Sequence, residues 1–208
     1  MNVNCMSMLD DLYKPDYKSR LTTQIIGRPG SGKSVYLRET ILQFLKRNKD
    51  PDYRMIFVCP KHEMVLSDKK EHQPIPTDKL EKHLRKNRVA IVYPDIDFLD
   101  QEADYIIELV FAIERENEGF SATVVIDDSQ VFVESRKSIS PALRRLALTG
   151  RSRGIRYVAV AHSVIYQKDL EGSTSYIIMF NLPFKQHWTD SIKRYGFNPE
   201  PYVEQLAG

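Results

Sequence analysis

One turn of the chain constrains its fold more than any other segment: residues 24–37, with the sequence QIIGRPGSGKSVYL. Gly27 is followed by four residues and then by Gly32, Lys33 and Ser34, which is the G-x-x-x-x-G-K-S pattern of a phosphate-binding loop. Glycine has no side chain, so the backbone at such positions can bend sharply and approach a ligand closely. The pattern therefore predicts a binding site for a nucleoside triphosphate.

The segments on either side of this turn are those that a phosphate-binding loop requires. Residues 22–26 are mostly apolar or β-branched and predict a buried strand, and residues 34–48 place apolar side chains near helical spacing. The free N–H groups and the positive dipole end of such a helix favour an anion in the loop. We expect Lys33 to reach the β- and γ-phosphates and the Ser34 hydroxyl to bind Mg²⁺. The residues expected to bind the nucleotide, ATP, are Gly27, Arg28, Pro29, Gly30, Ser31, Gly32, Lys33, Ser34 and Val35.

The composition is typical of a soluble globular protein. With 208 residues, 42% of them hydrophobic and 28% charged, the chain is long enough for one large domain. Its formal net charge of +2 gives no overall attraction to nucleic acid, so any basic surface must be local. No run of about 18 apolar residues occurs and the first residues do not resemble a signal peptide, so we expect no stable membrane insertion. The two cysteines, Cys5 and Cys59, favour a reducing, intracellular site of action.

Short apolar segments alternate with amphipathic segments along the chain. The segments that predict strands are residues 21–26, 54–59, 88–94, 122–128, 154–163 and 174–183. The segments that predict helices are residues 34–48, 100–117, 140–150 and 184–196. This alternation predicts an α/β fold, with a mainly parallel sheet and helices on both faces. No linker-like segment divides the chain, so we expect a single domain over residues 1–208, with an N-terminal arm at 1–20 and a core at about 21–195.

Two adjacent acids follow the fourth predicted strand, in the segment TVVIDD. Asp127 is expected at the carboxyl end of that strand, where open α/β sheets bind their ligands, and there it would contact Mg²⁺, mostly through water. Asp128 is expected to orient or deprotonate the water that attacks the γ-phosphate. The alternative interpretation is a solvated Asp-Asp turn, which the phosphate-binding loop upstream makes less attractive.

The tandem acids also bear on the order of the strands. In one large class of phosphate-loop NTPases, the ASCE or RecA-like class, another strand lies between the loop strand and the acid strand, and a catalytic acid stands beside the Mg²⁺ acid. We expect this arrangement here. A GTPase is disfavoured, because the segment NKDP at residues 48–51 has proline where a guanine-reading motif has aspartate.

The segment LRRLALTGRSRGIRYVAVAHS, residues 143–163, resembles a pattern of the FtsK–HerA superfamily of ring-forming DNA translocases. More specifically, the chain is similar to the DNA-packaging ATPases of tailless, membrane-containing icosahedral viruses. Those proteins join a loop like GRPGSGKS, an acid strand like VVIDD, a GR-containing segment that ends in GI, and a polar sensor after the next strand. The resemblance covers about residues 21–165.

This resemblance implies a function. ATP hydrolysis would drive double-stranded DNA through a homo-oligomeric ring, a pentamer or a hexamer, at a viral capsid or portal vertex. The protein would then act in the host cytoplasm, in the virion, or in both. Lys33 and Ser34 would hold the phosphates and Mg²⁺, Asp127 would bind Mg²⁺, and Asp128 would activate water.

The resemblance further implies an arginine finger, which is offered to the ATP of a neighbouring subunit. Arg151 is the first candidate, and the alternatives are Arg153, Arg144 and Arg145. The competing interpretation of these arginines is a solvated basic face.

His162 stands where the family usually has glutamine or asparagine as a sensor of the γ-phosphate. A neutral histidine can donate one hydrogen bond, but its protonation would make the site sensitive to pH. Gln130, just after the acids, is a further candidate for part of this polar role.

Three other functions remain open from the sequence. A kinase of a nucleotide or small metabolite would also use the loop, and a binding module would use ATP only to switch assembly. Within the motor class, a filamentous-phage export or conjugation ATPase is the alternative. The basic segments 68–88 and 134–138 are candidates for DNA contact in a central pore, or are simply solvated.

Overall fold

The computed structural model describes residues 22–62, 64, 66–67, 69–134, 139–163, 165, 167–180, 189 and 193. The expected N-terminal arm and nearly all of the expected last helix, at 184–196, lie outside these residues. The strands are β1 (Thr22–Ile26), β2 (Tyr53–Val58), β3 (Val89–Val92), β4 (Ser121–Ile126), β5 (Ile155–Ala161) and β6 (Thr174–Met179).

The α-helices are α2 (Lys33–Arg47), α3 (Leu80–Leu84), α4 (Leu99–Glu116), α5 (Ser129–Glu134), α6 (Pro141–Thr149) and α7 (Lys168–Ser173). Short 3₁₀ turns are η1 (Lys70–His72), η2 (Thr77–Lys79), η3 (Ile96–Phe98) and η4 (Gly150–Arg153). Helices α5 and α7 were not expected from the sequence, because six residues are too few to show a helical period. Helix α3 lies in the polar segment that follows β2.

All the strand pairs are parallel, and the order across the sheet is β3-β2-β4-β5-β1-β6. Strand β5 pairs on one side with β1 and on the other with β4, so one strand separates the loop strand from the acid strand. This confirms the expectation that another strand separates the strand before the loop from the strand before the acids. The inserted strand, β5, comes after both β1 and β4 in the sequence, and β2 and β3 lie on the far side of β4.

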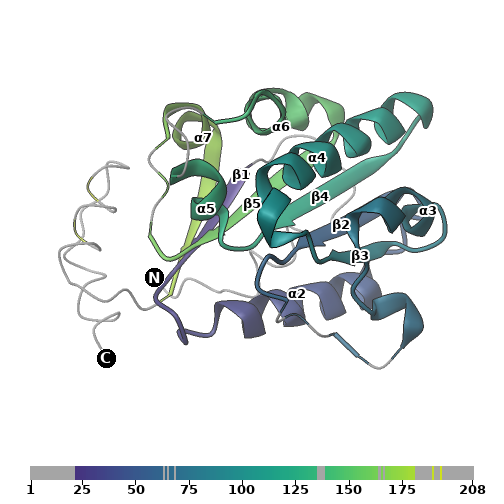
Figure 1. Cartoon of the computed structure of the whole chain (residues 1–208), viewed down its shortest axis with the longest axis horizontal. Coiled ribbons are helices and arrows are strands. Elements are labelled where there is room, and N and C mark those ends of the chain that lie inside the picture. Colours follow the sequence, from purple (N-terminus) through teal and green to yellow (C-terminus); the bar gives the residue numbers. More distant parts are fainter. Residues whose placement is uncertain are drawn as a thin grey trace.

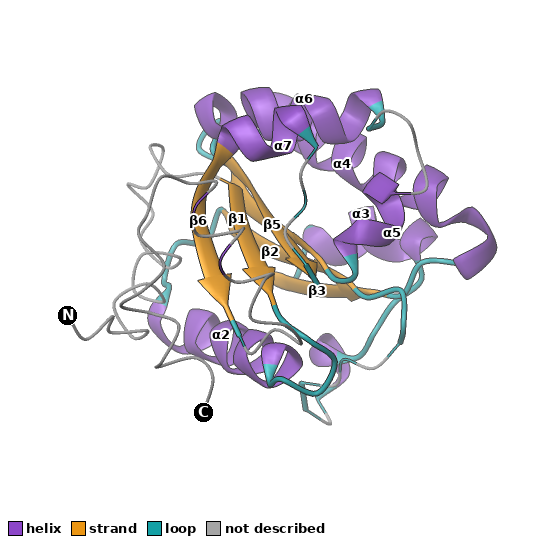
Figure 2. Ribbon diagram, turned by 90° about the vertical axis from the view of Figure 1, so that its left-hand side faces the viewer, coloured by secondary structure: helices purple, strands orange, loops and turns teal. Residues whose placement is uncertain are grey.

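The helices cover both faces of the sheet, as expected, with α2 on one side and α4, α6 and α7 on the other (Figures 1 and 2). Alternate residues of each strand are buried on opposite faces. Phe57 and Val125 pack in the cluster with Phe44 of α2, whereas Val58 and Val124 pack in the cluster that includes α4 and α6. Because both faces are covered, the strands read as nearly continuous apolar runs.

Two helix starts illustrate how local sequence sets these boundaries. Helix α6 begins at Pro141 and is capped by Ser140, whose hydroxyl accepts a hydrogen bond from Leu143 N. Helix α2 has no side-chain cap at its start, where Gly32 adopts a left-handed conformation with φ of 96°. Its first N–H groups are therefore left for a ligand. Within the described part of the chain, no helix is both long and apolar enough to cross a membrane.

The buried face of α4 provides a test of the packing. Phe111 is fully buried and the Arg145 guanidinium lies 4.0 Å from its ring centroid. We expect Phe111→Ala to lower the free energy of unfolding by about 3–5 kcal/mol, through the cavity it leaves. Tyr105→Ala, at a 48% exposed position on the same helix, should change it by less than about 0.5 kcal/mol. Urea unfolding measures both, and equal effects would contradict the packing described here.

Candidate nucleotide site

The carboxyl ends of β1, β2, β4 and β5 meet at one edge of the sheet. Gly27 N donates to Ala161 O at 3.2 Å, so the loop after β1 begins beside the end of β5. Asp127 N donates to Val58 O at 2.9 Å, so the acids after β4 begin beside the end of β2. The loop, the two acids and His162 therefore gather at the same edge, as the sequence predicts.

The loop after β1 needs its glycines for geometric reasons. Gly30 and Gly32 have φ values of 74° and 96°, a region that side chains disfavour. A Cβ atom on Gly27 would lie 2.6 Å from the Cβ atom of Phe180, so this position is closed to larger residues. Glycine is thus favoured by backbone conformation at two positions of the loop, and by lack of space at Gly27.

Lys33, the first residue of α2, turns its side chain back over the loop. Its ammonium donates to Gly27 O at 2.5 Å and to Arg28 O at 3.1 Å. Burial lowers the pKa of Lys33, while the charges of Asp127 and Asp128 oppose that shift. The ammonium therefore stands within the field of both acids and is held by two carbonyls that a phosphate could replace.

The tandem acids occupy the turn that follows β4, where they can face the same site. Asp128 has a positive φ of 49°, a conformation that aspartate adopts more readily than most residues. Its N–H donates to Asp127 Oδ1 at 2.9 Å. Burial, followed by the negative charge of Asp128, raises the pKa of Asp127. A buried acid pair of this kind favours a nearby cation.

Among the described residues, two basic side chains contact Asp128. Lys61 Nζ lies 2.7 Å from Oδ2, and His162 Nε2 lies 3.3 Å from Oδ1. Lys61 was not predicted from the sequence, because it lies in a turn 66 residues before the acids, in a segment with no motif. The only sequence signal was its position just after an apolar strand, and its meaning depends on β2 being the neighbour of β4.

His162 follows β5 directly and faces Asp128. Its backbone N–H donates to Gln130 Oε1 at 2.7 Å, so Gln130 holds the histidine backbone in place. Its Nδ1 atom is buried and, among the described residues, has no hydrogen-bond partner. A proton on Nδ1 would leave a buried donor unsatisfied, so Nε2, which faces Asp128, is the better placed donor of the ring. The sensor role expected of His162 stays a prediction.

The site offers oxygen ligands that suit Mg²⁺. Ser34 and Asp127 line one hollow, together with Val35, Arg38, Cys59, Lys61 and Met64. Mg²⁺ is usually bound by one or two protein oxygens, with water and substrate phosphates as the other ligands. Within the part of the chain that the structure describes, no three His, Cys, Asp or Glu side chains gather closely enough to hold a metal ion by themselves. The donors present therefore fit a cation that arrives with a nucleotide.

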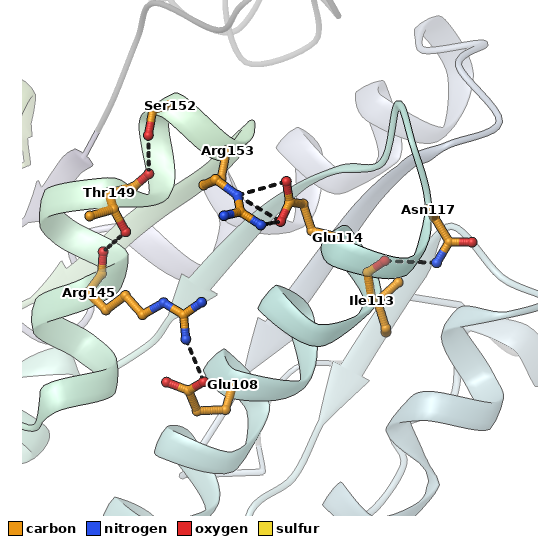
Figure 3. A network of polar contacts seen from close by, with 8 residues as sticks. All are labelled: Glu108, Ile113, Glu114, Asn117, Arg145, Thr149, Ser152 and Arg153. Carbon is orange, nitrogen blue, oxygen red and sulfur yellow. Dashed lines mark hydrogen bonds and ion pairs between the residues drawn. The ribbon is translucent and has the colours of Figure 1, made fainter.

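Three of the four candidate arginines are engaged in ion pairs. Arg144 pairs with Asp169 at 3.1 Å. Figure 3 shows Arg145 reaching Glu108, at 2.7 Å, and Arg153 reaching Glu114, both of them acids of α4. In the Arg153 pair, Nε lies 2.9 Å from both carboxylate oxygens. These contacts fasten α6 and η4 to α4 and α7.

Arg151 differs from the other three. It is exposed, and no ion pair or side-chain hydrogen bond joins it to the rest of the described chain. It lies in η4, which precedes β5 and therefore sits at the amino ends of the strands. Strand β4, with six residues, spans about 20 Å between that edge and the acids. Arg151 thus cannot reach the loop of its own chain.

Similarity to proteins of known structure extends over most of this chain. The genome packaging NTPase B204 of Sulfolobus turreted icosahedral virus 2, in complex with ATPγS, superposes with a TM-score of 0.63 at 14% identity, covering 93% of this chain and 87% of that one. The cytoplasmic domain of EssC gives 0.57 at 19% identity, over 93% of this chain and 36% of that one. Two ATPase units of EccC from Thermomonospora curvata give 0.56 at 14% identity, over 85% and 34%.

The fold is therefore that of phosphate-loop NTPases. No protein-family model matches the sequence, and no curated protein matches it significantly. At sequence identities of 14–19%, the structural similarity establishes the fold and nothing more. It agrees with the resemblance to the FtsK–HerA superfamily seen in the motifs.

The acid pair gives a test that needs no activity assay. Because the pKa of Asp127 is raised in the folded chain, its ionisation lowers stability as pH rises from the ordinary value of 3.8 through the raised one. We expect Asp127→Asn to raise the free energy of unfolding of the nucleotide-free protein at pH 7, and this gain to vanish below pH 3.8, where the aspartate is itself protonated.

Urea unfolding across this pH range measures the gain. Asp97→Asn, at an exposed position in η3, is the matched control and should show no such pH-dependent gain. A gain of the same size at every pH, or a loss at pH 7, would contradict the cause given for the raised pKa.

Proposed function

We propose that this chain is an ATP-hydrolysing motor that translocates double-stranded DNA and packages a viral genome into a preformed capsid. The observation that carries the proposal is the meeting of the phosphate-binding loop, the tandem acids and a polar residue at the ends of β1, β4 and β5. The fold likeness to a genome packaging NTPase supports it, because it extends over almost the whole of both chains.

The residues of the site have separate tasks in ATP hydrolysis. Lys33 and the loop backbone bind the β- and γ-phosphates, and Ser34 and Asp127 hold Mg²⁺. Mg²⁺, when bound, neutralises charge on the phosphates. Asp128 holds the attacking water and accepts its proton, which requires a carboxylate within hydrogen-bond reach of that water.

Arg151 is proposed to complete the site of a neighbouring subunit. It is the candidate arginine that is exposed and unengaged among the described residues, and it stands at the opposite edge of the sheet from the acids of its own chain. An arginine so placed can act on a bound nucleotide only across a subunit interface. The proposal therefore includes a homo-oligomeric ring, a pentamer or hexamer, located at a capsid or portal vertex.

A secretion or export motor is the second candidate, because EssC and the Type VII Secretion ATPase EccC share the fold. The likeness to B204 has the higher TM-score, 0.63 against 0.57 for EssC and 0.56 for EccC, which favours packaging. The match covers 87% of the B204 chain, 36% of the EssC chain and 34% of the EccC chain. The expected DNA contacts remain proposals: residues 69–88 pack at the β3 edge of the sheet, through Ile75, Leu80 and Leu84, and most of 134–138 lies outside the described residues.

The first experiment measures ATP turnover with and without long duplex DNA, together with the mass of the particle in solution. A packaging motor should turn over ATP, form a ring and be stimulated by duplex DNA. Asp128→Asn should keep ATP binding and lose turnover by about a hundredfold or more, because an amide accepts protons poorly. Lys33→Ala should lose binding and turnover together. Turnover that ignores DNA but follows a small phosphate acceptor would instead identify a kinase.

Arg151 can be tested by mixing inactive subunits. Arg151→Ala alone should bind ATP normally and lose roughly a thousandfold in rate, the effect of a missing finger in other NTPases. Arg151→Ala mixed with Lys33→Ala should regain part of the activity, since some interfaces then pair an intact finger with an intact loop. Arg115→Ala, which removes an exposed arginine near the same edge, is the control and should stay active. Rings that form but remain inactive in the mixture would contradict a finger acting between subunits.

A further inference from the structure

Lys61 contacts the acid that the proposed mechanism uses as a base. Its ammonium lies 2.7 Å from Asp128 Oδ2. The two partners differ in exposure: the Lys61 side chain is 52% exposed, whereas that of Asp128 is 7% exposed. The lysine can therefore move away on its flexible stem, while the aspartate is fixed in the structure.

The turn that carries Lys61 is anchored on the side away from the acids. Cys59 N donates to Val92 O at 3.0 Å, and His62 N closes the turn on Cys59 O at 3.2 Å. The His62 ring stacks on Tyr93, with centroids 4.4 Å apart, and its Nε2 lies 3.2 Å from Pro94 O. His62 also has a positive φ of 56°, a strained backbone conformation that these contacts hold in place. The turn therefore presents Lys61 to the site from a fixed base.

Lys61 also borders the hollow in which the terminal phosphate of a bound nucleotide would lie. Lys61 lines the same hollow as Ser34 and Asp127, the two residues that fit Mg²⁺. Two ammonium groups, those of Lys33 and Lys61, stand among the two carboxylates. Lys33 is held by loop carbonyls, so Lys61 is the ammonium in direct contact with Asp128, on the carboxylate oxygen that His162 does not contact.

We propose that Lys61 is a phosphate-sensing residue that exchanges Asp128 for the terminal phosphate when ATP binds. Without a triphosphate, the ion pair holds the Asp128 carboxylate and keeps it from engaging water. The terminal phosphate carries more negative charge than one carboxylate, so it competes successfully for the ammonium. Asp128 then becomes available to the water only when there is a phosphate to attack. This inference rests on the proposed ATPase function.

The first test compares two nucleotides that differ in the terminal phosphate. Lys61→Met keeps most of the length of the side chain and removes its charge. We expect its affinity for AMPPCP, a non-hydrolysable ATP analogue, to fall by about tenfold, the worth of one charge-assisted hydrogen bond. Its affinity for ADP should change by less than about twofold, and Lys61→Arg should restore much of the loss. Lys46→Met, at an exposed position on α2, controls for the lost charge and should bind both nucleotides normally.

The second test asks whether the ion pair with Asp128 competes with the phosphate. Asp128→Asn removes the ion pair that competes with the phosphate, so this variant should prefer AMPPCP over ADP several-fold more strongly than the unmodified protein does. In Lys61→Met/Asp128→Asn the extra preference should disappear. Isothermal titration calorimetry in excess Mg²⁺ gives all the affinities for this double-mutant cycle.

Each outcome separates this inference from the function on which it rests. If the unmodified protein binds neither nucleotide, the proposed function fails. If the unmodified protein binds both, and Lys61→Met weakens ADP and AMPPCP equally or changes neither, then Lys61 only stabilises the site and the inference is wrong. The inference is also wrong if Asp128→Asn gains the same preference with Met at position 61, because simple removal of a negative charge would then explain it.

Discussion

The parallel pairing of β5 with both β1 and β4 is the constraint on which the rest of the site depends. The register aligns Ile26 of β1 with Ala161, and Ile126 of β4 with Ala159. The residues that follow these strands are thereby brought to one edge: the glycine-rich loop, the tandem acids and His162. No single segment contains this site, and backbone hydrogen bonds between strands far apart in the sequence assemble it.

Burying two carboxylates side by side carries a cost, and the surrounding cations offset it. Asp127 and Asp128 are adjacent, and the raised pKa of Asp127 reflects both burial and its neighbour. Lys33 and Lys61 supply positive charge from two different strands, β1 through its loop and β2 through its turn. The ionised acid pair that lowers the stability of the free protein would favour the divalent cation proposed to bind here, which links the energetics of the fold to its proposed chemistry.

The four candidate arginines lie in α6 and η4, the two elements that precede β5. Three arginines form ion pairs with acids of neighbouring helices: Arg144 with Asp169, Arg145 with Glu108, and Arg153 with Glu114. These contacts give the three arginines a structural role. Arg151 is left exposed on a turn fixed by those contacts and lies at the far edge of the sheet from the acids. A protein whose loop and acids stand at one edge and whose unengaged arginine stands at the other is suited to head-to-tail association, in which each subunit serves the next.

The sequence by itself determined the loop, the two acids and the alternation of strands and helices, because each is encoded within a few neighbouring residues. Glycine spacing, β-branched runs and helical periodicity are local signals, and the expected strand positions match the observed strands to within a few residues. The tertiary structure alone decided that β5 is the inserted strand, that Lys61 contacts Asp128, and that Arg153 pairs with Glu114 while the Arg151 side chain has no described ion-pair or hydrogen-bond partner. These facts depend on which strand ends and helices become neighbours, and contacts between residues 30 to 70 positions apart leave no periodic trace in the sequence.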